Sequence, residues 1–425
     1  MDSVLDEFAW RGMLHDATEG ADEHLAGGDR VCYIGFDPTA PSLHVGSLLP
    51  IMGLVHMQRA GHHPIALVGG GTGLIGDPSG KSAERQLLTA EKARENAEAI
   101  HRQLEHFLDF EVKSNPARMR NNLDWLGQLP LVEFLRDVGK HFSVNAMLRK
   151  ESVRRRLESE ESGISYTEFS YQLLQAYDFV ELFRGEGCTV QLGGSDQWGN
   201  ITAGIDLVRR LEGGHAVGAV FPLVTSSSGT KFGKTEAGTV WLDPEWTSPF
   251  RFYQFWINTD DHDAVRYLRF FSLLDRATIE EVEGQSEAEP HRRHAQRALA
   301  EDVTRRVHGE DGLARARQAT EALFGGSIDG LAGDDVADIF ADVPSSQVPS
   351  AELQGEGLEL LDLLARSGLA SSRGDARRSV EGGGIYLNSL RQEDPQGRVT
   401  TEQTIEGRFL VLRKGKKNYH LVKVV

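Results

Sequence analysis

Short apolar runs alternate with longer amphipathic stretches over the first half of the chain. The apolar runs have the length and composition of buried strands and cover 31–36, 64–68 and 189–192. The amphipathic stretches repeat apolar residues at helical spacing and cover 82–110, 167–182 and 200–211. Strands that alternate with helices build a parallel sheet covered on both faces. Residues 1–243 are therefore expected to form an α/β, Rossmann-like, doubly wound domain with ligands at the carboxyl ends of its strands.

The pattern changes after residue 243. Helical periodicity continues over 244–330, which predicts an all-helical domain. Residues 331–354 are acidic with scattered Gly, Ser and Pro, and they are expected to be a linker with one short helix. In 355–425 a helical repeat and a second helix capped at Ser372 precede a glycine-rich turn and a strand at 385–388. This order predicts a small α+β domain.

Net charge differs along the chain. The whole chain of 425 residues carries −17, which by itself argues against a nucleic-acid partner. Residues 355–425, however, hold 12 Lys and Arg against 9 Asp and Glu. A small basic domain after an acidic one is typical of an RNA-binding surface, and the alternative is a solvated region with ordinary charge variation. The candidate RNA-binding cations are Arg373, Arg377, Arg378, Lys414, Lys416 and Lys417.

Cysteine content and hydropathy limit the class of protein. Cys32 and Cys188 are the two cysteines, too few for a disulfide framework or a structural zinc site. No apolar run approaches the roughly 20 residues that a membrane-spanning helix needs, and the acidic N-terminus is unlike a signal peptide. We expect a cytoplasmic protein with no membrane partner and no protein-bound structural metal.

Two short segments, 187 residues apart, look like two halves of one ATP site. In the first, the strand at 31–36 leads through an Asp-Pro-Thr turn into a helix expected to begin near Ser42, which would place His44, Gly46 and Ser47 in its first turn. Free N–H groups and the dipole at a helix start favour phosphate. The second segment, 231–235, places two lysines three residues apart in a loop with a glycine. Such a loop suits a mobile clamp on a polyphosphate.

Two other nucleotide signatures are weaker. Gly71-Thr-Gly73-Leu-Ile-Gly76 follows a strand and matches the GxGxxG pattern of dinucleotide-binding oxidoreductases. Asp77 follows directly, a carboxylate where pyrophosphate should lie, and the following Pro-Ser-Gly interrupts the helix that this pattern needs. The two possible P-loops each leave three residues between their glycines, whereas the P-loop needs four.

The segments around 44–47 and 231–235 resemble the HIGH and KMSKS signatures of class I aminoacyl-tRNA synthetases. The surrounding sequence resembles the bacterial tyrosyl-tRNA synthetase family over nearly the whole chain, in seven motifs that occur in the family's order. One position departs from the pattern, because Ser47 stands where histidine is usual. A serine can donate a hydrogen bond to a phosphate or ribose oxygen but carries no charge. The matching motifs are 33–48, 69–85, 142–145, 171–178, 191–200, 231–235 and 372–388.

The resemblance implies a tyrosine–tRNA ligase that joins L-tyrosine to ATP with loss of pyrophosphate and then transfers the tyrosyl group to the terminal adenosine of tRNA(Tyr). Mg²⁺ would arrive with ATP. The groups implied to act on the phosphates are Thr39, His44, Ser47, Lys81, Arg85, Lys231 and Lys234. The tyrosine-binding residues would be Tyr33 and Asp178 at the phenol, with Asp77, Tyr171, Gln175 and Gln197 around the ammonium group and backbone. The ATP-binding set would be Gly35, Asp37, Gly46, Gly194, Asp196 and Lys234.

The resemblance also implies a homodimer, whose interface would lie in the segment 121–156 inserted between the halves of the nucleotide fold, with Phe134, Leu135 and Phe142 as candidates. Two other functions remain as alternatives. One is a related transferase that acts on something other than tRNA, which the helical and C-terminal domains disfavour. The other is a non-catalytic RNA-binding relative, which the presence of His44, Asp178 and both lysines of 231–235 disfavours.

Overall fold

The computed structural model describes residues 3–79, 88–157, 163–227, 232–235, 238–323, 326–341, 343–415 and 418–425. The chain divides into two compact units. Unit 1 comprises 1–243 and 259–299, and unit 2 comprises 244–258 and 300–425. The predicted helical domain is thus shared between the units, and its boundaries stay a prediction.

Unit 1 is built on a six-stranded sheet in the order β1-β6-β5-β2-β3-β4. The last five strands in this order are parallel, and only β1 runs antiparallel, beside β6. Sequence order reverses between β2 and β5, which is where a doubly wound sheet binds its ligands. The predicted fold class is confirmed. The strands are β1 (Asp16–Ala17), β2 (Val31–Phe36), β3 (His63–Val68), β4 (Arg118–Asn121), β5 (Cys188–Gly194) and β6 (Val217–Phe221).

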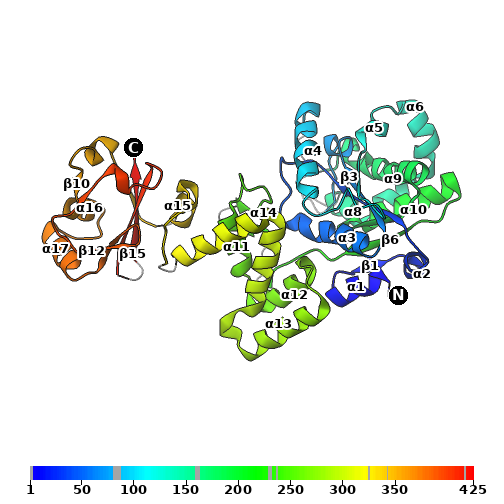
Figure 1. Ribbon diagram of the computed structural model, residues 1–425. Helices are drawn as coiled ribbons and strands as arrows, with labels where there is room; N and C mark the ends of the chain where they lie inside the picture. The colour runs from blue at the N-terminus through cyan, green and yellow to red at the C-terminus, as the bar shows by residue number, and fades with distance from the viewer. Residues whose placement is uncertain are drawn as a thin grey trace. The chain divides into compact units, whose positions relative to one another are not determined.

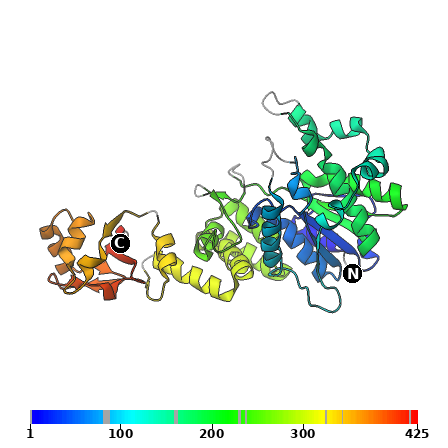
Figure 2. The ribbon, with the colours of Figure 1, turned by 90° about the horizontal axis from the view of Figure 1, so that it is seen from above.

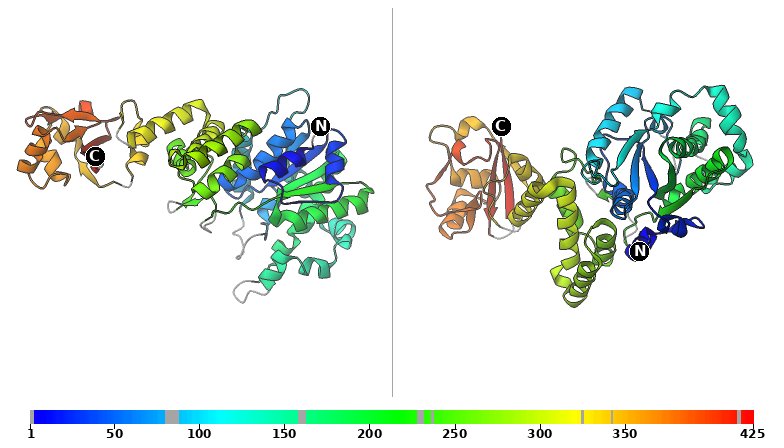
Figure 3. Two further views of the ribbon diagram at one scale, coloured as in Figure 1. Left: turned by 90° about the horizontal axis from the view of Figure 1, so that it is seen from below. Right: turned by 45° about the vertical axis from the view of Figure 1, so that its right-hand side comes forward.

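Helices cover both faces of this sheet, with α3 and α4 on one side and α9 and α10 on the other (Figure 3). Helices α9 and α10, green in Figure 2, pack side by side. The strand interiors are apolar, and both cysteines are free and buried there. The helices of this layer and of the N-terminus are α1 (Val4–Arg11), α2 (Ala21–Ala26), α3 (Leu48–Arg59), α4 (Ala90–Leu104), α9 (Tyr166–Glu186) and α10 (Trp198–Glu212).

The region from α11 to α14 is helical, as the periodicity after residue 243 predicted. In unit 1, Arg11 is 3% exposed and donates to the carbonyl oxygens of Arg269, Ser272 and Leu274, so its guanidinium caps the end of α12. No helix in the described ranges is both long and apolar enough to cross a membrane. The helices of this region are α11 (Pro249–Ile257), α12 (Asp261–Phe271), α13 (Arg276–Ala288) and α14 (His294–Leu323).

The C-terminal part of unit 2 is a five-stranded sheet in the order β12-β11-β14-β15-β9. Helices α16 and α17 lie on one face of the sheet and α15 on the other (Figure 1). Strand β9 falls in the predicted linker, and it pairs in parallel with β15 as the edge of the sheet. The elements are α15 (Gly333–Ile339), β9 (Ser345–Val348), α16 (Leu360–Arg366), α17 (Arg373–Glu381), β11 (Ile385–Leu387), β12 (Leu390–Gln392), β14 (Phe409–Lys414) and β15 (Asn418–Val424).

Candidate active site

The two signature segments meet in unit 1. His44 forms an antiparallel bridge with Trp241, and the Val45 N–H donates to the Val240 carbonyl. The second segment joins this pair, because the Val240 N–H donates to the Gly233 carbonyl at 3.0 Å. Gly233 has φ +78, and a Cβ there would lie 2.7 Å from Cγ2 of Val45. Only glycine fits both the backbone conformation and the close approach.

The predicted helix start at Ser42 is wrong by several residues. His44 is extended, with φ −125 and ψ 170, and a short 3-10 turn over Val45–Ser47 precedes α3, which begins at Leu48. The reason is the pairing with 240–242, which holds His44 in an extended conformation and delays the first turn until Val45. His44 still caps the turn, because its Nδ1 accepts from the Gly46 N–H at 3.0 Å. Its ring is exposed, whereas Ser47 is half-buried.

Asp178 is the most deeply buried carboxylate of the predicted tyrosine site. Its side chain accepts hydrogen bonds from Asn122 Nδ2 at 2.9 Å and from Trp125 Nε1 at 2.7 Å. The residue is 2% exposed, and burial raises the pKa of its carboxyl to about 8, although the two hydrogen bonds act to lower it. Asp178 therefore holds a proton over much of the neutral range and is anchored from both oxygens.

Tyr33 lies near this carboxyl on β2. Burial raises the pKa of its phenol well above the ordinary value, and the nearby charge of Asp178 adds to the shift. The Tyr33 hydroxyl is buried and makes no hydrogen bond within the described parts of the chain. A buried hydroxyl without a partner is costly, so a polar group of a ligand at this point would restore a lost hydrogen bond.

A second polar network joins Asp77 to the start of α10. Gln197 Nε2 donates to Asp77 Oδ2 at 2.7 Å, and Gln175 Nε2 donates to Gln197 Oε1 at 3.2 Å. Asn200 Nδ2 contacts Gln175 Oε1 at 2.9 Å and Gln197 Oε1 at 3.1 Å. The predicted ammonium-binding residues Asp77 and Gln175 are thus brought together, through Gln197.

Tyr171 is connected differently. Its hydroxyl donates to Asp37 Oδ2 at 2.9 Å, and Thr72 Oγ1 donates to Asp37 Oδ1 at 2.7 Å. This links α9 to the turn after β2, where Asp37 was predicted to contact the nucleotide. Gly69 makes room for it, because a Cβ at Gly69 would lie 2.0 Å from Asp37 Oδ1. Tyr171, Gln175 and Asp178 follow one another along one side of α9, as their spacing predicted.

The GxGxxG segment serves this site as a turn. Its Thr72–Leu74 part is a 3-10 turn, and the N–H of Gly71 donates to Asn122 Oδ1 at 2.7 Å. The Thr72 N–H points to the same oxygen at 3.5 Å. An asparagine of the same domain therefore accepts the N–H groups that a dinucleotide would need, as expected if the pattern is a chance match.

Three side chains of this region were missed from the sequence. Asn122 and Trp125 hold Asp178, and a signal for them existed, because the run Asn-Asn-Leu-Asp-Trp begins at the last residue of β4, at the carboxyl edge of the sheet. Lys150 gave no signal. Its Nζ donates to the Gly199 carbonyl, and burial lowers the pKa of its ammonium to about 7, with Asp77 the charge that opposes the shift.

The remaining predicted residues lie at the same edge or outside the described ranges. Gly35, Thr39 and Asp196 are exposed, and Gly194 is half-buried at the end of β5. Lys234 is exposed on a two-residue strand that pairs with Gly238–Thr239. Lys81, Arg85, Lys231, Lys416 and Lys417 lie outside the described residues.

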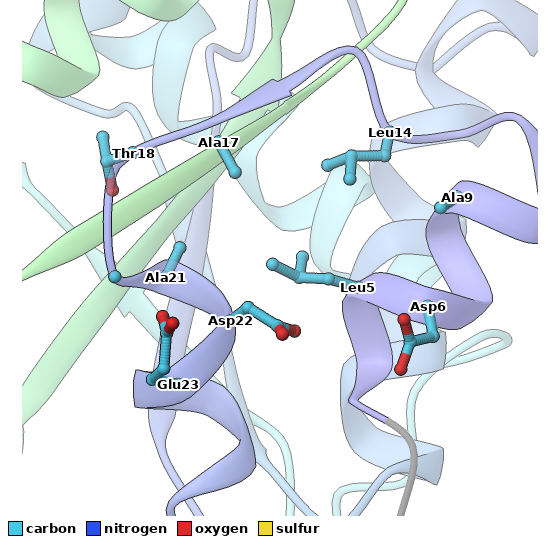
Figure 4. A pocket seen from close by; sticks show the side chains of 10 residues that line it. Leu5, Asp6, Ala9, Leu14, Ala17, Thr18, Ala21, Asp22 and Glu23 are labelled. Atoms are coloured by element: carbon cyan, nitrogen blue, oxygen red, sulfur yellow. The ribbon is translucent and has the colours of Figure 1, made fainter.

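A pocket of about 300 Å³ lies elsewhere, between α1 and α2 (Figure 4). Leu5 and Leu14 form part of its wall, and Asp6, Asp22 and Glu23 bring three carboxylates to it. None of its ten lining residues is basic. A polyphosphate would be repelled here, so this pocket does not compete with the strand edge as a nucleotide site.

Comparisons with known proteins agree with this geometry. Residues 26–325 match the family model of class I tRNA synthetases (W and Y), and residues 335–422 match the SYY-like C-terminal domain of tyrosine–tRNA ligase. The tyrosine–tRNA ligase of Roseiflexus castenholzii is 57% identical over 425 residues, covering 100% of both chains. That of Geobacillus stearothermophilus is 51% identical and covers 99% of both.

Solved structures point the same way. A C-terminally truncated mitochondrial tyrosyl-tRNA synthetase of Aspergillus nidulans superposes with a TM-score of 0.70 at 31% identity, over 76% of this chain and 95% of that one. The corresponding Coccidioides posadasii protein gives a TM-score of 0.66 at 30% identity, over 74% of this chain and 91% of that one. The chain therefore belongs to the class I tRNA synthetases, within the tyrosine–tRNA ligase family.

Proposed function

We propose that the strand edge of unit 1 carries out both steps of tyrosine–tRNA ligation with the residues described above. The chain is an aminoacyl-tRNA ligase of the tyrosine type. The observation that supports the proposed site best is the approach of Gly233 to Val45, which joins two segments far apart in sequence at one edge of the sheet. Tyr33 and Asp178 lie on β2 and α9 of the same unit.

In the first step a carboxylate oxygen of tyrosine attacks the α-phosphorus of ATP and the bond to pyrophosphate breaks. The nucleophile is already charged, so the protein contributes position and charge stabilisation. His44, Thr39 and Lys234 are proposed to contact the phosphates, and Mg²⁺ would be held by phosphate oxygens and water. In the second step a ribose hydroxyl of the tRNA terminus attacks the tyrosyl carbonyl and AMP leaves.

Tyrosine is proposed to be selected at its phenol. The ring would lie on apolar side chains while its hydroxyl meets Tyr33 and Asp178. Phenylalanine would leave the buried Tyr33 hydroxyl unpaired and would give Asp178 no partner beyond Asn122 and Trp125. Unpaired buried groups are the basis of strong rejection, an effect for which tyrosyl-tRNA synthetase is itself the standard example. Asp77, Tyr171 and Gln175 are proposed to hold the ammonium group.

The test is amino-acid-dependent ATP–pyrophosphate exchange with Mg²⁺, offering tyrosine, phenylalanine and tryptophan separately. Exchange with tyrosine alone is expected. Asp178→Asn should lower exchange with tyrosine strongly, while Asp124→Asn, two residues from Asn122, should not. Equal exchange with phenylalanine in the unmodified chain would exclude the proposed phenol contacts, and exchange with no amino acid would exclude the proposed site.

We also propose that the chain acts as a homodimer through the segment 131–148. Five large apolar side chains of this segment are exposed, which is unusual for a free surface. Of the candidates from the sequence, Leu135 is on this surface, whereas Phe134 and Phe142 pack against the core of unit 1. Val132→Asp should convert the dimer to monomer in sedimentation experiments. The exposed side chains are Leu131, Val132, Leu135, Val144 and Leu148.

The C-terminal domain is proposed to hold tRNA(Tyr). Arg377 and Arg378 are exposed on α17, whose N-cap Ser372 accepts from the Asp375 N–H as predicted. Arg373 is paired with Glu359 and Asp362. Lys414 donates to the Leu369 carbonyl and contacts Asp375 at 3.3 Å. Arg378 lies 3.8 Å from Asp375, so Arg377, which forms no ion pair among the described residues, is better placed for phosphate than the other three cations.

A further inference from the structure

A row of alternating cations and aromatic rings crosses the C-terminal sheet. Cross-strand pairing places Arg391 of β12 opposite Tyr386 of β11, and Tyr386 opposite Arg413 of β14. Arg413 in turn lies opposite Tyr419 of β15. Directly opposite residues of antiparallel strands project from the same face. The four side chains therefore form one row, defined here as the Arg–Tyr row.

Within the Arg–Tyr row, Arg413 lies against both tyrosine rings. The Arg413 guanidinium carbon lies 4.0 Å from the ring centroid of Tyr386 and 5.9 Å from that of Tyr419. In the described part of the domain Arg413 forms no ion pair, unlike Arg373, Arg366 and Arg398 of the same domain. Among these residues, therefore, no carboxylate neutralises its charge.

The row lies on the face opposite α16 and α17. Ile385 and Leu412, neighbours of the row in sequence, point the other way and belong to the core beneath those helices. At one end, Tyr419 is anchored, because its ring lies 5.2 Å from that of Phe340 and its hydroxyl reaches the Ala322 carbonyl at 3.4 Å. At the other end Arg391 donates to the Gly383 carbonyl oxygen and pairs with Glu393 at 3.5 Å, with a side chain that is 53% exposed. Tyr386 and Arg413 are half-buried.

We propose that Arg391, Tyr386 and Arg413 form a stacking site for an unpaired nucleotide of the bound RNA. Aromatic rings and guanidinium planes stack on bases, and Arg413, which no described carboxylate neutralises, supplies charge for an adjoining phosphate. A double helix keeps its base faces covered, so the occupant is a single-stranded nucleotide. This surface is separate from the cations of α17, which lie on the other face. The inference rests on the proposed RNA-binding role of this domain.

The test measures the affinity of the full-length chain for a tRNA(Tyr) transcript. Tyr386→Leu should weaken binding by roughly 5- to 150-fold, the range for loss of one base–aromatic stack. Tyr386→Phe keeps the ring and should retain the affinity. The salt dependence of the affinity separates stacking from charge. Tyr386→Leu should leave the slope of log affinity against log salt concentration unchanged, whereas Arg413→Gln should reduce that slope. Tyrosine-dependent pyrophosphate exchange should stay unchanged in all three variants.

Lys423→Gln serves as the matched control, since Lys423 is an exposed cation near the far end of β15. Its affinity should stay within about twofold. Ultraviolet crosslinking of the unmodified chain gives a readout that does not depend on variant folding: crosslinks should form in the peptides that contain Tyr386 or Arg413. Crosslinks confined to other peptides, or equal affinity of Tyr386→Leu and the unmodified chain, would overturn the stacking site.

Arg377→Gln on α17 separates this inference from the proposed role of the whole domain. Weaker binding in Arg377→Gln together with unchanged binding in Tyr386→Leu means that the domain binds RNA without the Arg–Tyr row. Unchanged binding in both variants means that the proposed RNA-binding role is itself wrong. A short single-stranded oligoribonucleotide should compete for the row, whereas its duplex form should not.

Discussion

Polar side chains are held in opposite ways in the active-site region of unit 1 and in the C-terminal domain. In unit 1 they are buried: Arg156 and Glu168 pair at 2.9 Å with side chains that are each 2% exposed, and Asp178 is equally covered. In the C-terminal domain Arg373 bridges Glu359 and Asp362 with a side chain that is 56% exposed. The same chemical pairs therefore occur in very different surroundings.

The difference fits the ligand proposed for each region. A buried polar group cannot be rehydrated when its partner is lost, so losing such a partner costs much free energy of folding. The buried interactions of unit 1 therefore hold their side chains in one geometry. That suits recognition of a small amino acid. Exposed pairs are screened by water and salt and exchange easily, so they suit the proposed role of the C-terminal cations, which would exchange their carboxylates for the phosphates of RNA.

Breaking the buried ion pair is expected to have the largest effect. Arg156→Met leaves the Glu168 carboxylate buried without its cation and also removes the hydrogen bond from Arg156 to the Gly163 carbonyl. The free energy of unfolding of unit 1 should fall by about 3–5 kcal/mol. Urea denaturation followed by tryptophan fluorescence measures this change.

The control for this prediction is Arg154→Met on the same helix, α8 (Glu151–Leu157), where the side chain is exposed. Its effect should stay within about 0.5 kcal/mol. Equal losses of unfolding free energy in the two variants would show that burial does not determine how much each arginine stabilises the protein. The contrast drawn between the two regions would then be wrong.

Asp178 is expected to make the stability of unit 1 depend on pH. Its pKa is about 8 in the folded chain against an ordinary value of 3.8, so between these values the folded state binds a proton that the unfolded state releases. Stability from this residue is full below about pH 4 and falls as the pH rises toward 8, by up to about 1.4 kcal/mol per pH unit.

Denaturation midpoints between pH 5 and 8 test this, and Asp178→Asn should flatten the profile. Asp206 gives a control of opposite sign, because hydrogen bonds from Arg209 and Arg210 lower its pKa against the opposing effect of partial burial. Its contribution is lost only when the pH falls through the lowered pKa, so Asp206→Asn should leave the slope above pH 5 as it was. A steep slope that persists in Asp178→Asn would assign it to another group.

The fold was largely predictable because periodicity is a local property. The strand at 31–36 and the helical faces around Tyr171 and Asp178 follow from the spacing of apolar residues alone. The start of α3 was not predictable in this way. His44 is extended because it pairs with Trp241, nearly 200 residues later, and no local pattern contains that partner.

The residues of the candidate active site also divide into those that the sequence predicted and those that it did not. Side chains in recognisable motifs, such as Asp77 and Gln197, were predicted to share a site, and the structure joins them by a direct hydrogen bond. The groups that hold the motif residues were missed, because Asn122 and Trp125 act through Asp178 and have no motif of their own. Tyr171 was among the predicted site residues, but its contact with Asp37 was not predicted, because this contact depends on how α9 packs against β2.

Substitution of Asn122 is expected to have the next largest effect among the buried polar groups. Asn122→Ala removes hydrogen bonds to Asp178 and Thr72 and leaves the Gly71 N–H without its acceptor. The free energy of unfolding should fall by about 1–3 kcal/mol. The KM for tyrosine in pyrophosphate exchange should rise, because Asp178 loses one of its two anchors.

Asn121→Ala is the matched control, since Asn121 ends β4 directly before Asn122 and is half-buried, and its Oδ1 accepts from the Leu123 N–H. It should lower stability by less and leave the KM for tyrosine near that of the unmodified chain. A larger rise in KM for Asn121→Ala than for Asn122→Ala would show that the turn, and not the contact with Asp178, sets tyrosine binding.

The smallest effect is expected at the exposed pair of the C-terminal domain. Arg373→Gln removes both ion pairs, but water replaces them, so the free energy of unfolding should change by less than about 1 kcal/mol. The difference should shrink further at high salt, because surface charges are screened. Thermal unfolding of the full chain in low and high salt measures both quantities. A loss as large as that of Arg156→Met would mean that these cations hold the domain together and are not free to exchange their carboxylates for RNA phosphates.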